Sequence, residues 1–126
     1  MKSMNTLRKG YVVEYECESG IVRAGKREWK IEEGSYLYVG SCGKSCTGRL
    51  SRHLAPQVKR KRWHVDHLKE LCTPVSALVL PLTEQELVGK LPTERALSKF
   101  GSSDYPDHAG HLFQMGLVEA LSHLLA

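Results

Sequence analysis

The sequence lacks any long apolar stretch. Its longest mostly apolar run, Val75 to Leu82, is far shorter than the roughly 20 residues that a helix needs to cross a bilayer. The first residues, Met1 to Arg8, contain no apolar segment of the kind that signal peptides carry. We therefore expect no membrane-spanning segment and a location in the cytoplasm.

Cysteine is scarce as well, with four in 126 residues. Because no secretion signal is recognised, these cysteines are predicted to be reduced thiols rather than a disulfide framework. Cys17 and Cys72 are expected in the core, where a thiol behaves as a small apolar side chain.

A zinc site is one interpretation of Cys42 and Cys46, whose spacing is that of half a tetrahedral site. The histidines His53, His64 and His67 would supply the remaining ligands, and the protein would then be a metal-binding adaptor. The alternative for Cys42 is a half-buried residue that follows a strand.

Acidic residues are absent between Glu33 and Asp66, and the formal net charge of the chain is +4. An uncompensated basic block raises the local potential and attracts polyanions, of which nucleic acid is the commonest. For the run from Lys59 to Arg62 alone, the alternative is a solvated basic loop. The basic residues of the block are Lys44, Arg49, Arg52, Lys59, Arg60, Lys61 and Arg62.

The length of 126 residues predicts a single domain over residues 1–126. Alternation of apolar and polar residues from Gly10 to Cys17 predicts a strand with one buried face. The segment from Ile21 to Ile31 is expected to form a strand pair, and Tyr36 to Ser41 another strand. These segments predict a small, mostly antiparallel sheet.

Helix signals begin at Thr47 and end before Pro56. A second short helix is expected from Trp63 to Cys72, and Val75 to Leu82 reads as a fully buried strand. Thr83 opens a capping-box pattern, which predicts the start of a third helix. Leu112 to Leu125 is predicted to form a final helix that packs on the sheet of the same chain, as in a monomer. The fold class is therefore α/β (α+β), with a central sheet flanked by helices.

The most informative stretch is Tyr36-Leu-Tyr-Val-Gly-Ser-Cys42, followed by Arg49-Leu-Ser-Arg-His53. A tyrosine at the end of a strand can form hydrogen bonds and accept a proton. An arginine on the next helix can bind a phosphate with two parallel hydrogen bonds, and Arg49 and His53 share one helix face. This combination indicates phosphodiester chemistry.

These motifs resemble the GIY-YIG nuclease superfamily. Gly10-Tyr11-Val12 resembles its first strand motif, although the tyrosine follows the glycine directly, and Tyr38-Val39-Gly40-Ser41 resembles the second. The similarity is greater to an uncharacterised branch that is sometimes fused to endonuclease-III-type DNA glycosylases. The matching motifs are Gly34-x-Tyr-x-Tyr-Val-Gly-Ser41, Arg52-His53, Lys61-x-Trp-His-Val-Asp66, Glu84-x-Glu86 and Phe100-Gly-Ser-Ser-Asp104.

Relatives of that branch tend to carry cysteines where this chain has Tyr105-Pro-Asp-His108. If those cysteines hold a metal or a structural bridge, this chain has lost the feature or replaced it with His108 and His111.

The resemblance implies a site with two tyrosines, an arginine for the scissile phosphate, a histidine that takes or relays a proton, and a glutamate that holds Mg²⁺ or Mn²⁺. On this sequence the implied residues are Tyr11, Tyr38, Arg49, His53, His64 and Glu86.

Each implied role has an alternative. Tyr36 and Tyr38 share a strand face and would also fit as core aromatics with satisfied hydroxyl groups. Glu86 would be explained fully by the capping box that Thr83 opens, which would leave Glu84 as the metal ligand, or neither residue.

The sequence thus predicts a metal-dependent DNA endonuclease that acts in repair or on branched structures. The alternative is a nucleic-acid-binding module with the nuclease fold and no catalysis. RNA is the alternative substrate to DNA.

Overall fold

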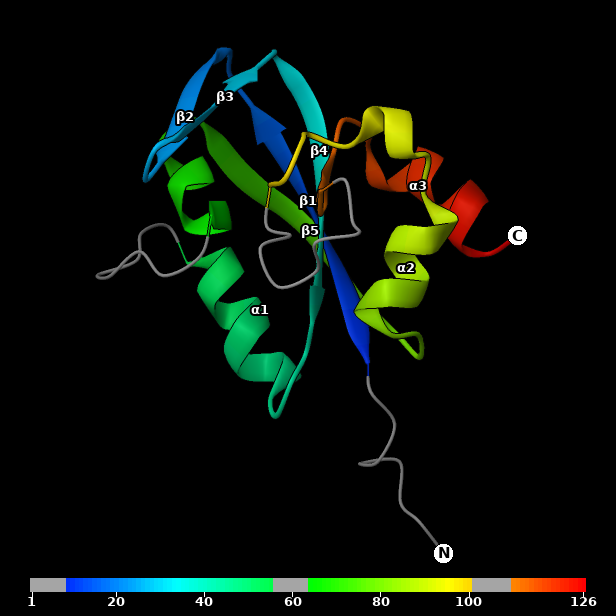
Figure 1. The fold of residues 1–126 in the computed structure, drawn as a ribbon. Helices are drawn as coiled ribbons and strands as arrows, with labels where there is room; N and C mark the ends of the chain where they lie inside the picture. Colours follow the sequence, from blue (N-terminus) through cyan, green and yellow to red (C-terminus); the bar gives the residue numbers. More distant parts are fainter. Residues whose placement is uncertain (1–8, 56–63, 101–109) are drawn as a thin grey trace, which may run out of the picture.

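The computed structural model describes residues 9–55, 64–100 and 110–126, with the backbone alone for His64 (Figure 1). The elements in chain order are β1 (Gly10–Cys17), β2 (Gly20–Ala24), β3 (Arg27–Ile31), β4 (Gly34–Ser41), α1 (Cys46–Leu54), the 3-10 helix η2 (His64–Glu70), β5 (Cys72–Leu80), α2 (Glu84–Lys90), the 3-10 turn η3 (Thr93–Arg95), β6 (Leu112–Phe113) and α3 (Leu117–Leu124).

The central sheet has the strand order β5-β1-β4-β6, and every pair in it is antiparallel. Strand β1 therefore has a partner on both sides, with Tyr11 opposite Gly40 of β4 and Val79 of β5. Strands β2 and β3 form a separate two-stranded hairpin. The mostly antiparallel sheet and the strand pair near the N-terminus confirm the predicted fold class.

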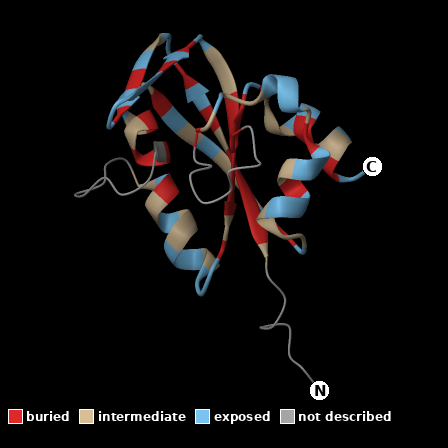
Figure 2. Cartoon of the chain, viewed as in Figure 1, coloured by how far each residue is buried: buried red, intermediate tan, exposed pale blue. Residues whose placement is uncertain are grey.

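Helices cover both faces of this sheet (Figure 1). Helices α1 and η2 and the β2–β3 hairpin pack on one face, and α2 and α3 pack on the other. Alternation along β1 sends Tyr11 and Tyr15 to the first face and Val12 to the second, and all three side chains are buried. Figure 2 shows that buried residues are concentrated in the central strands. The expectation that β1 buries only one face holds at Glu16, which is exposed, but fails at Val12, because helices cover both faces at the start of this strand.

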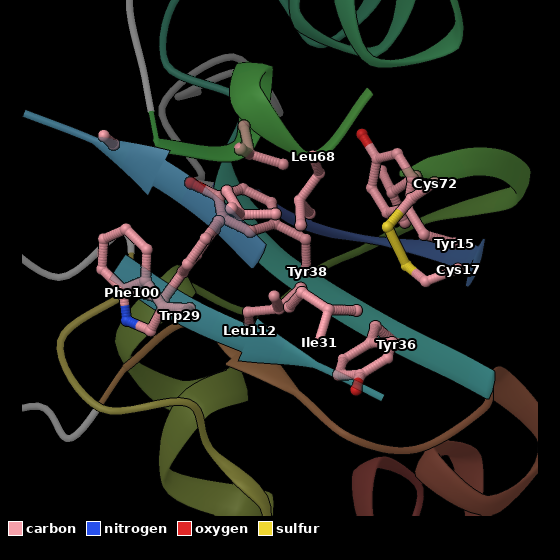
Figure 3. Packing of buried hydrophobic residues seen from close by; sticks show 14 of the residues in the cluster. Tyr15, Cys17, Trp29, Ile31, Tyr36, Tyr38, Leu68, Cys72, Phe100 and Leu112 are labelled. Atoms are coloured by element: carbon pink, nitrogen blue, oxygen red, sulfur yellow. A yellow bond between two sulfur atoms is a disulfide. The ribbon is translucent and has the colours of Figure 1, made fainter. Parts of the chain in front are cut away.

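The first core cluster joins the hairpin to the rest of the domain. Trp29 of β3 lies edge-on to Phe100, with ring centroids 4.7 Å apart. Its indole Nε1 donates a hydrogen bond of 2.7 Å to the backbone oxygen of Ser98. Figure 3 shows the two rings side by side, with Leu112 next along the cluster. The hairpin is thus anchored to the segment that precedes β6.

Strand β5 differs from its prediction as a fully buried strand over Val75 to Leu82. It spans Cys72–Leu80 and lies at an edge of the sheet. Val75 and Val79 are 56% and 36% exposed. Their β-branched, apolar character predicted a strand correctly but could not show that, among the described residues, the strand would pair with β1 alone.

Two predicted helices are shorter than expected. Within the segment predicted from Trp63 to Cys72, η2 spans His64–Glu70 and Cys72 already belongs to β5, while Trp63 lies outside the described residues. The last helix begins at Leu117 rather than Leu112, because Leu112 and Phe113 pair with β4 as strand β6. A carboxylate oxygen of Glu14 on β1 accepts a hydrogen bond from the backbone N–H of Leu117, 2.9 Å away. This tertiary contact satisfies one of the N–H groups at the start of α3.

The cysteines are paired, which corrects the prediction of reduced thiols. One disulfide joins Cys17 to Cys72, and the other joins Cys42 to Cys46. Cys17 and Cys72 face each other across the β1–β5 pair, with Cα atoms 4.0 Å apart (Figure 3). Sequence spacing alone cannot reveal such a contact, because it is created by strand pairing.

Helix α3 packs on the sheet through Ala120 and Leu124, while Val118 and Leu125 are exposed. None of the helices described is long and apolar enough to cross a membrane.

Candidate active site

Two tyrosines from neighbouring strands lie on one face of the central sheet. Tyr38 of β4 is paired with Val13 of β1, and directly paired residues of antiparallel strands point to the same face. Tyr11, two positions from Val13, therefore shares this face with Tyr38. A Cβ atom at Gly40 would lie only 2.4 Å from the phenol oxygen of Tyr11. The glycine of the Tyr-Val-Gly motif thus leaves the space that the Tyr11 side chain fills.

His53 of α1 lies between two tyrosines of β1. Its Nε2 atom is 2.7 Å from the hydroxyl oxygen of Tyr11, and its Nδ1 atom is 2.7 Å from that of Tyr15. The ring of Tyr38 is also close, with ring centroids 5.3 Å apart. His53 is 2% exposed, so the helix places a polar ring inside the core. Three predicted site residues are therefore brought together: Tyr11, Tyr38 and His53.

Burial keeps this group uncharged at neutral pH. It lowers the pKa of His53 to about 4, although the Asp66 carboxylate opposes this shift. Burial also raises the pKa of Tyr11, Tyr15 and Tyr38. A neutral imidazole has one N–H donor and one acceptor nitrogen. One tyrosine must therefore donate a hydrogen bond to His53, and the other must accept one from it.

Arg49 belongs to α1, one helical turn before His53, and its side chain contacts the last residue of β4. Its Nη1 atom donates a hydrogen bond of 2.9 Å to the backbone oxygen of Ser41. The guanidinium packs against Gly43, where a Cβ would lie 3.0 Å from Nη2 and where φ is +58°. Its positive charge partly offsets the effect of burial on the pKa of Tyr11. The turn after β4 thus positions a cation beside the tyrosine and histidine group.

The other basic residues that were predicted to bind nucleic acid differ in their surroundings. Lys44 is exposed in the turn that leads to α1. Arg52 forms an ion pair with the buried Asp66, with Nη2–Oδ2 and Nε–Oδ1 distances of 2.8 and 3.2 Å. This pair links α1 to η2, so its geometry favours a structural role for Arg52. The four predicted residues Lys59, Arg60, Lys61 and Arg62 lie outside the described residues.

Glu86 is part of the N-terminal cap of α2, which was the alternative role predicted for it from the sequence. Its carboxylate accepts a hydrogen bond from the backbone N–H of Thr83 at 3.0 Å. The Thr83 hydroxyl accepts one from the backbone N–H of Glu86 at 3.1 Å, which completes the capping box. The side chain predicted to hold the metal thus contributes to the N-terminal cap of α2.

Glu84 is the first residue of the same helix. Of the two glutamates, it is the one whose charge acts on the tyrosines of the site. Together with burial, its charge raises the pKa of both Tyr11 and Tyr38. One oxygen of Glu84 lies 2.6 Å from Nδ1 of His111, a contact that is close in distance but not aligned as a hydrogen bond. The side chain of Glu84 is 12% exposed and that of His111 is fully buried. A carboxylate is therefore held at the edge of the candidate site.

A single magnesium or manganese ion would fit this arrangement. Mg²⁺ is commonly held by one or two carboxylates and keeps several water ligands. Glu84 offers one carboxylate as a ligand, and its charge and that of Arg49 both act on Tyr11. Over the three described ranges, no group of three or more histidine, cysteine, aspartate and glutamate side chains forms a metal cage.

The zinc interpretation is not compatible with the sulfur atoms as they are bonded here. The sulfurs of Cys42 and Cys46 bind each other, so neither is a thiolate ligand. His111 contacts Glu84, and His67 is only partly buried in η2. The side chain of His64 and the whole of His108 lie outside the described residues.

Two residues of the site were missed as functional candidates. Tyr15 was predicted only as a buried strand residue, and His111 only as a possible substitute ligand for a structural metal. The alternation from Tyr11 to Tyr15 places both on one strand face, so this signal was available for Tyr15. No local pattern connects His111 to Glu84, because these residues meet only through tertiary packing.

A family model described as domain of unknown function DUF123 matches residues 11–126. This range includes every site residue named above from Tyr11 to His111. Neither a curated protein nor a solved structure matches the chain.

Proposed function

The chain belongs to the DUF123 family, and we propose from its site that it is a metal-dependent DNA endonuclease that acts in repair or on branched strands. The observation that carries this proposal is the hydrogen bond between Tyr11 and His53 beside the Arg49 guanidinium. The GIY-YIG resemblance of the same motifs implies the same chemistry.

In this proposal Arg49 binds the scissile phosphate, and the exposed Lys44 binds a neighbouring one. A guanidinium matches two phosphate oxygens at once and reduces their negative charge. The hydrogen bond from Arg49 to the Ser41 carbonyl limits the conformations of the Arg49 side chain. The side chain therefore loses less conformational entropy when it binds a phosphate. Both cations belong to the turn between β4 and α1.

Tyr11 is the proposed general base, with His53 as its proton acceptor. As the water oxygen bonds to phosphorus, the water proton moves to the Tyr11 oxygen and the Tyr11 proton moves to Nε2 of His53. The bond between phosphorus and the departing sugar oxygen breaks, and that oxygen takes a proton from solvent. His53 is neutral at pH 7 and so offers a lone pair on one ring nitrogen, although the burial that lowers its pKa opposes its protonation.

Glu84 is the proposed ligand for Mg²⁺ or Mn²⁺, in place of Glu86. The bound ion supplies charge neutralisation on the phosphoryl and leaving oxygens. His111 limits the movement of the Glu84 carboxylate through the contact described above. The cytoplasmic location predicted from the sequence remains part of the proposal, although the paired cysteines remove the thiol argument for it.

A non-catalytic nucleic-acid-binding module is the second candidate. The burial of the site favours it, since Tyr11 and His53 are each 2% exposed and Tyr38 is 8% exposed. A buried tyrosine and histidine pair would also serve as a structural contact between β1 and α1. In that case Arg49 and Lys44 would bind phosphates without hydrolysis, and affinity would fall steeply with salt.

The test is cleavage of labelled single-stranded, nicked, flapped and four-way DNA, with an RNA arm, in Mg²⁺ and in Mn²⁺. Wild-type protein is expected to cut at least one DNA substrate. Arg49→Ala should reduce cutting by about 100-fold or more, as expected when a group that stabilises transition-state charge is lost. Tyr11→Phe should reduce it by a similar factor because it removes the base.

Arg27→Ala is the matched control, because Arg27 is an exposed arginine at the tip of the β2–β3 hairpin. It should cut as the wild type does. Binding without cutting, weakened by Arg49→Ala and unchanged by Tyr11→Phe, would instead identify a recognition module.

A further inference from the structure

The disulfide between Cys42 and Cys46 has no role in the proposed hydrolysis, yet it closes the turn from β4 to α1. The enclosed residues 43–45 are exposed and include Lys44. Arg49 follows in the first turn of α1. The two cations proposed to bind phosphates are therefore held by a turn that one covalent bond fixes.

The position of the Arg49 side chain depends on this turn. Its guanidinium donates a hydrogen bond to the backbone oxygen of Ser41 and packs against Gly43. Hydrogen bonds inside the turn are long, at 3.1 Å from the N–H of Ser45 to the oxygen of Cys42 and 3.3 Å from the N–H of Gly43 to Oγ of Ser41. A glycine that is released from a constraint gains more conformational freedom than any other residue. Loss of the disulfide would therefore leave the turn, and the guanidinium that packs on it, less ordered.

Access from solvent distinguishes this disulfide from the other. Cys46 is partly exposed, whereas Cys42, Cys17 and Cys72 are buried. Thiol–disulfide exchange requires that the attacking thiolate reach one of the two sulfurs. Cys46 is also the first residue of α1, where the backbone N–H groups of the first turn stabilise a thiolate and no acidic side chain opposes them. Cys42–Cys46 is therefore the bond that a thiol in solution reaches first.

We propose that Cys42–Cys46 is a redox switch, which a small thiol of the glutathione class opens and the disulfide of that thiol closes. With the bond closed, the turn holds Lys44 and Arg49 in place for phosphates. With the bond open, these side chains have to be ordered on binding, and the affinity for nucleic acid falls. The effect on nucleic-acid binding rests on the proposed function, whereas the exchange reaction and the ordering of Arg49 do not.

The exchange takes two steps. An external thiolate attacks the sulfur of Cys46, the S–S bond breaks, and Cys42 leaves as a thiolate that takes a proton from solvent. A second external thiolate attacks the external sulfur of this mixed disulfide, and Cys46 leaves as a thiolate that the start of α1 stabilises. Two external thiols are thus oxidised to one disulfide, and the protein disulfide is reduced to two thiols. Glutathione disulfide reverses both steps.

The first experiment treats the full chain with reduced glutathione, alkylates the free thiols at a series of times, and locates them by peptide mass spectrometry. Cys42 and Cys46 are expected to become alkylated while Cys17 and Cys72 remain paired. The longer disulfide is thus the internal control. Reduction of both disulfides together, or of Cys17–Cys72 first, would overturn the inference.

The second experiment compares the closed and open forms. Fluorescence anisotropy with labelled branched DNA, without divalent metal, measures binding apart from cleavage. The open form should bind about three- to tenfold more weakly, which is the cost of ordering one long side chain on binding. The ¹H–¹⁵N heteronuclear NOE of the Arg49 side-chain Nε–H group should also fall when the bond opens.

Cys42→Ser with Cys46→Ser should bind like the open form in every redox buffer. Cys17→Ala with Cys72→Ala is the matched control, because it removes the other disulfide and should keep the full redox response. If this control fails to fold, the comparison between the serine variant and the wild type still separates the two disulfides.

An unchanged Arg49 NOE in the open form would overturn the inference, as would equal DNA affinity of the two forms. Absence of DNA binding in both forms would overturn the proposed function instead. The NOE would then decide by itself whether the disulfide orders Arg49.

Discussion

At the scale of single residues, the buried group formed by Tyr11, Tyr15 and His53 most strongly constrains the function. All three side chains are at most 2% exposed, yet both ring nitrogens of the histidine have partners. Leaving a buried polar group without a partner costs roughly 1–3 kcal/mol. The two tyrosine hydroxyls avoid this cost, so a polar cluster is stable within the core.

The titration of His53 predicts that acid destabilises the protein. Burial lowers the pKa of His53 to about 4 from 6.5, so the unfolded chain binds a proton here at a higher pH than the folded protein does. The contribution of this residue to stability is therefore complete above pH 6.5. It is lost as the pH falls toward 4, by about 3 kcal/mol in total. Urea denaturation at a series of pH values between 7.5 and 4.5 measures this loss.

His53→Gln should show a weaker loss of stability over the same pH range, although it is less stable than the wild type at pH 7. His67→Gln, a change in a partly buried histidine of η2, should retain the full pH dependence. A pH dependence that disappears in His67→Gln and persists in His53→Gln would contradict this assignment.

At the scale of elements, the start of α2 separates two glutamates with different roles. Glu86 closes the capping box with Thr83, while Glu84 contacts His111 and its charge raises the pKa of Tyr11. The two residues are two positions apart, so they point to different sides of one short helix. Helix geometry thus explains why only one of them lies near the site.

Mn²⁺ binding should therefore depend on Glu84 and not on Glu86. Glu84→Gln keeps the size of the side chain but removes its charge, and is expected to weaken Mn²⁺ affinity by at least about tenfold. Calorimetric titration of the protein with Mn²⁺ measures this independently of cleavage.

Glu86→Gln is the control for that titration, because glutamine also completes a capping box. It should bind Mn²⁺ as the wild type does. Equal loss of affinity in both variants, or loss in Glu86→Gln alone, would remove Glu84 as the proposed ligand.

At the scale of the whole molecule, the two disulfides differ in how much chain they constrain. Cys17–Cys72 joins residues 55 positions apart and ties β1 to β5, whereas Cys42–Cys46 joins residues four positions apart. The entropy lost by the unfolded chain grows with the length of the closed loop. The longer loop is therefore expected to contribute more to stability.

Removal of the longer disulfide should lower the free energy of unfolding by about 4 kcal/mol, against about 2 kcal/mol for the shorter one. The variants are Cys17→Ala with Cys72→Ala, and Cys42→Ala with Cys46→Ala, compared by urea denaturation without reductant. A larger loss from the second pair would contradict the loop-length argument. Mass spectrometry of the untreated protein checks that the wild type carries both bonds.

Sequence predictions were correct where they depend on interactions between residues close in the chain, and they failed where strand pairing decides. The strand over Gly10 to Cys17, the β2–β3 pair and the capping box at Thr83 were correct because each depends on a local pattern. The final helix was predicted too long because its apolar residues fit a helix and a strand equally well. Only pairing with β4 shows that Leu112 and Phe113 form a strand.

The sequence by itself determined which residues of the candidate site share a local element. Arg49 and His53 are four positions apart on a helix, and Tyr11 and Tyr15 alternate along a strand, so their spacing already assigns them to common faces. The tertiary structure decided the contacts between elements: His53 with Tyr15, Glu84 with His111, and Cys17 with Cys72. These contacts depend on strand register and on the placement of helices over the sheet, and both are set by the packing of the whole core rather than by neighbours in the chain.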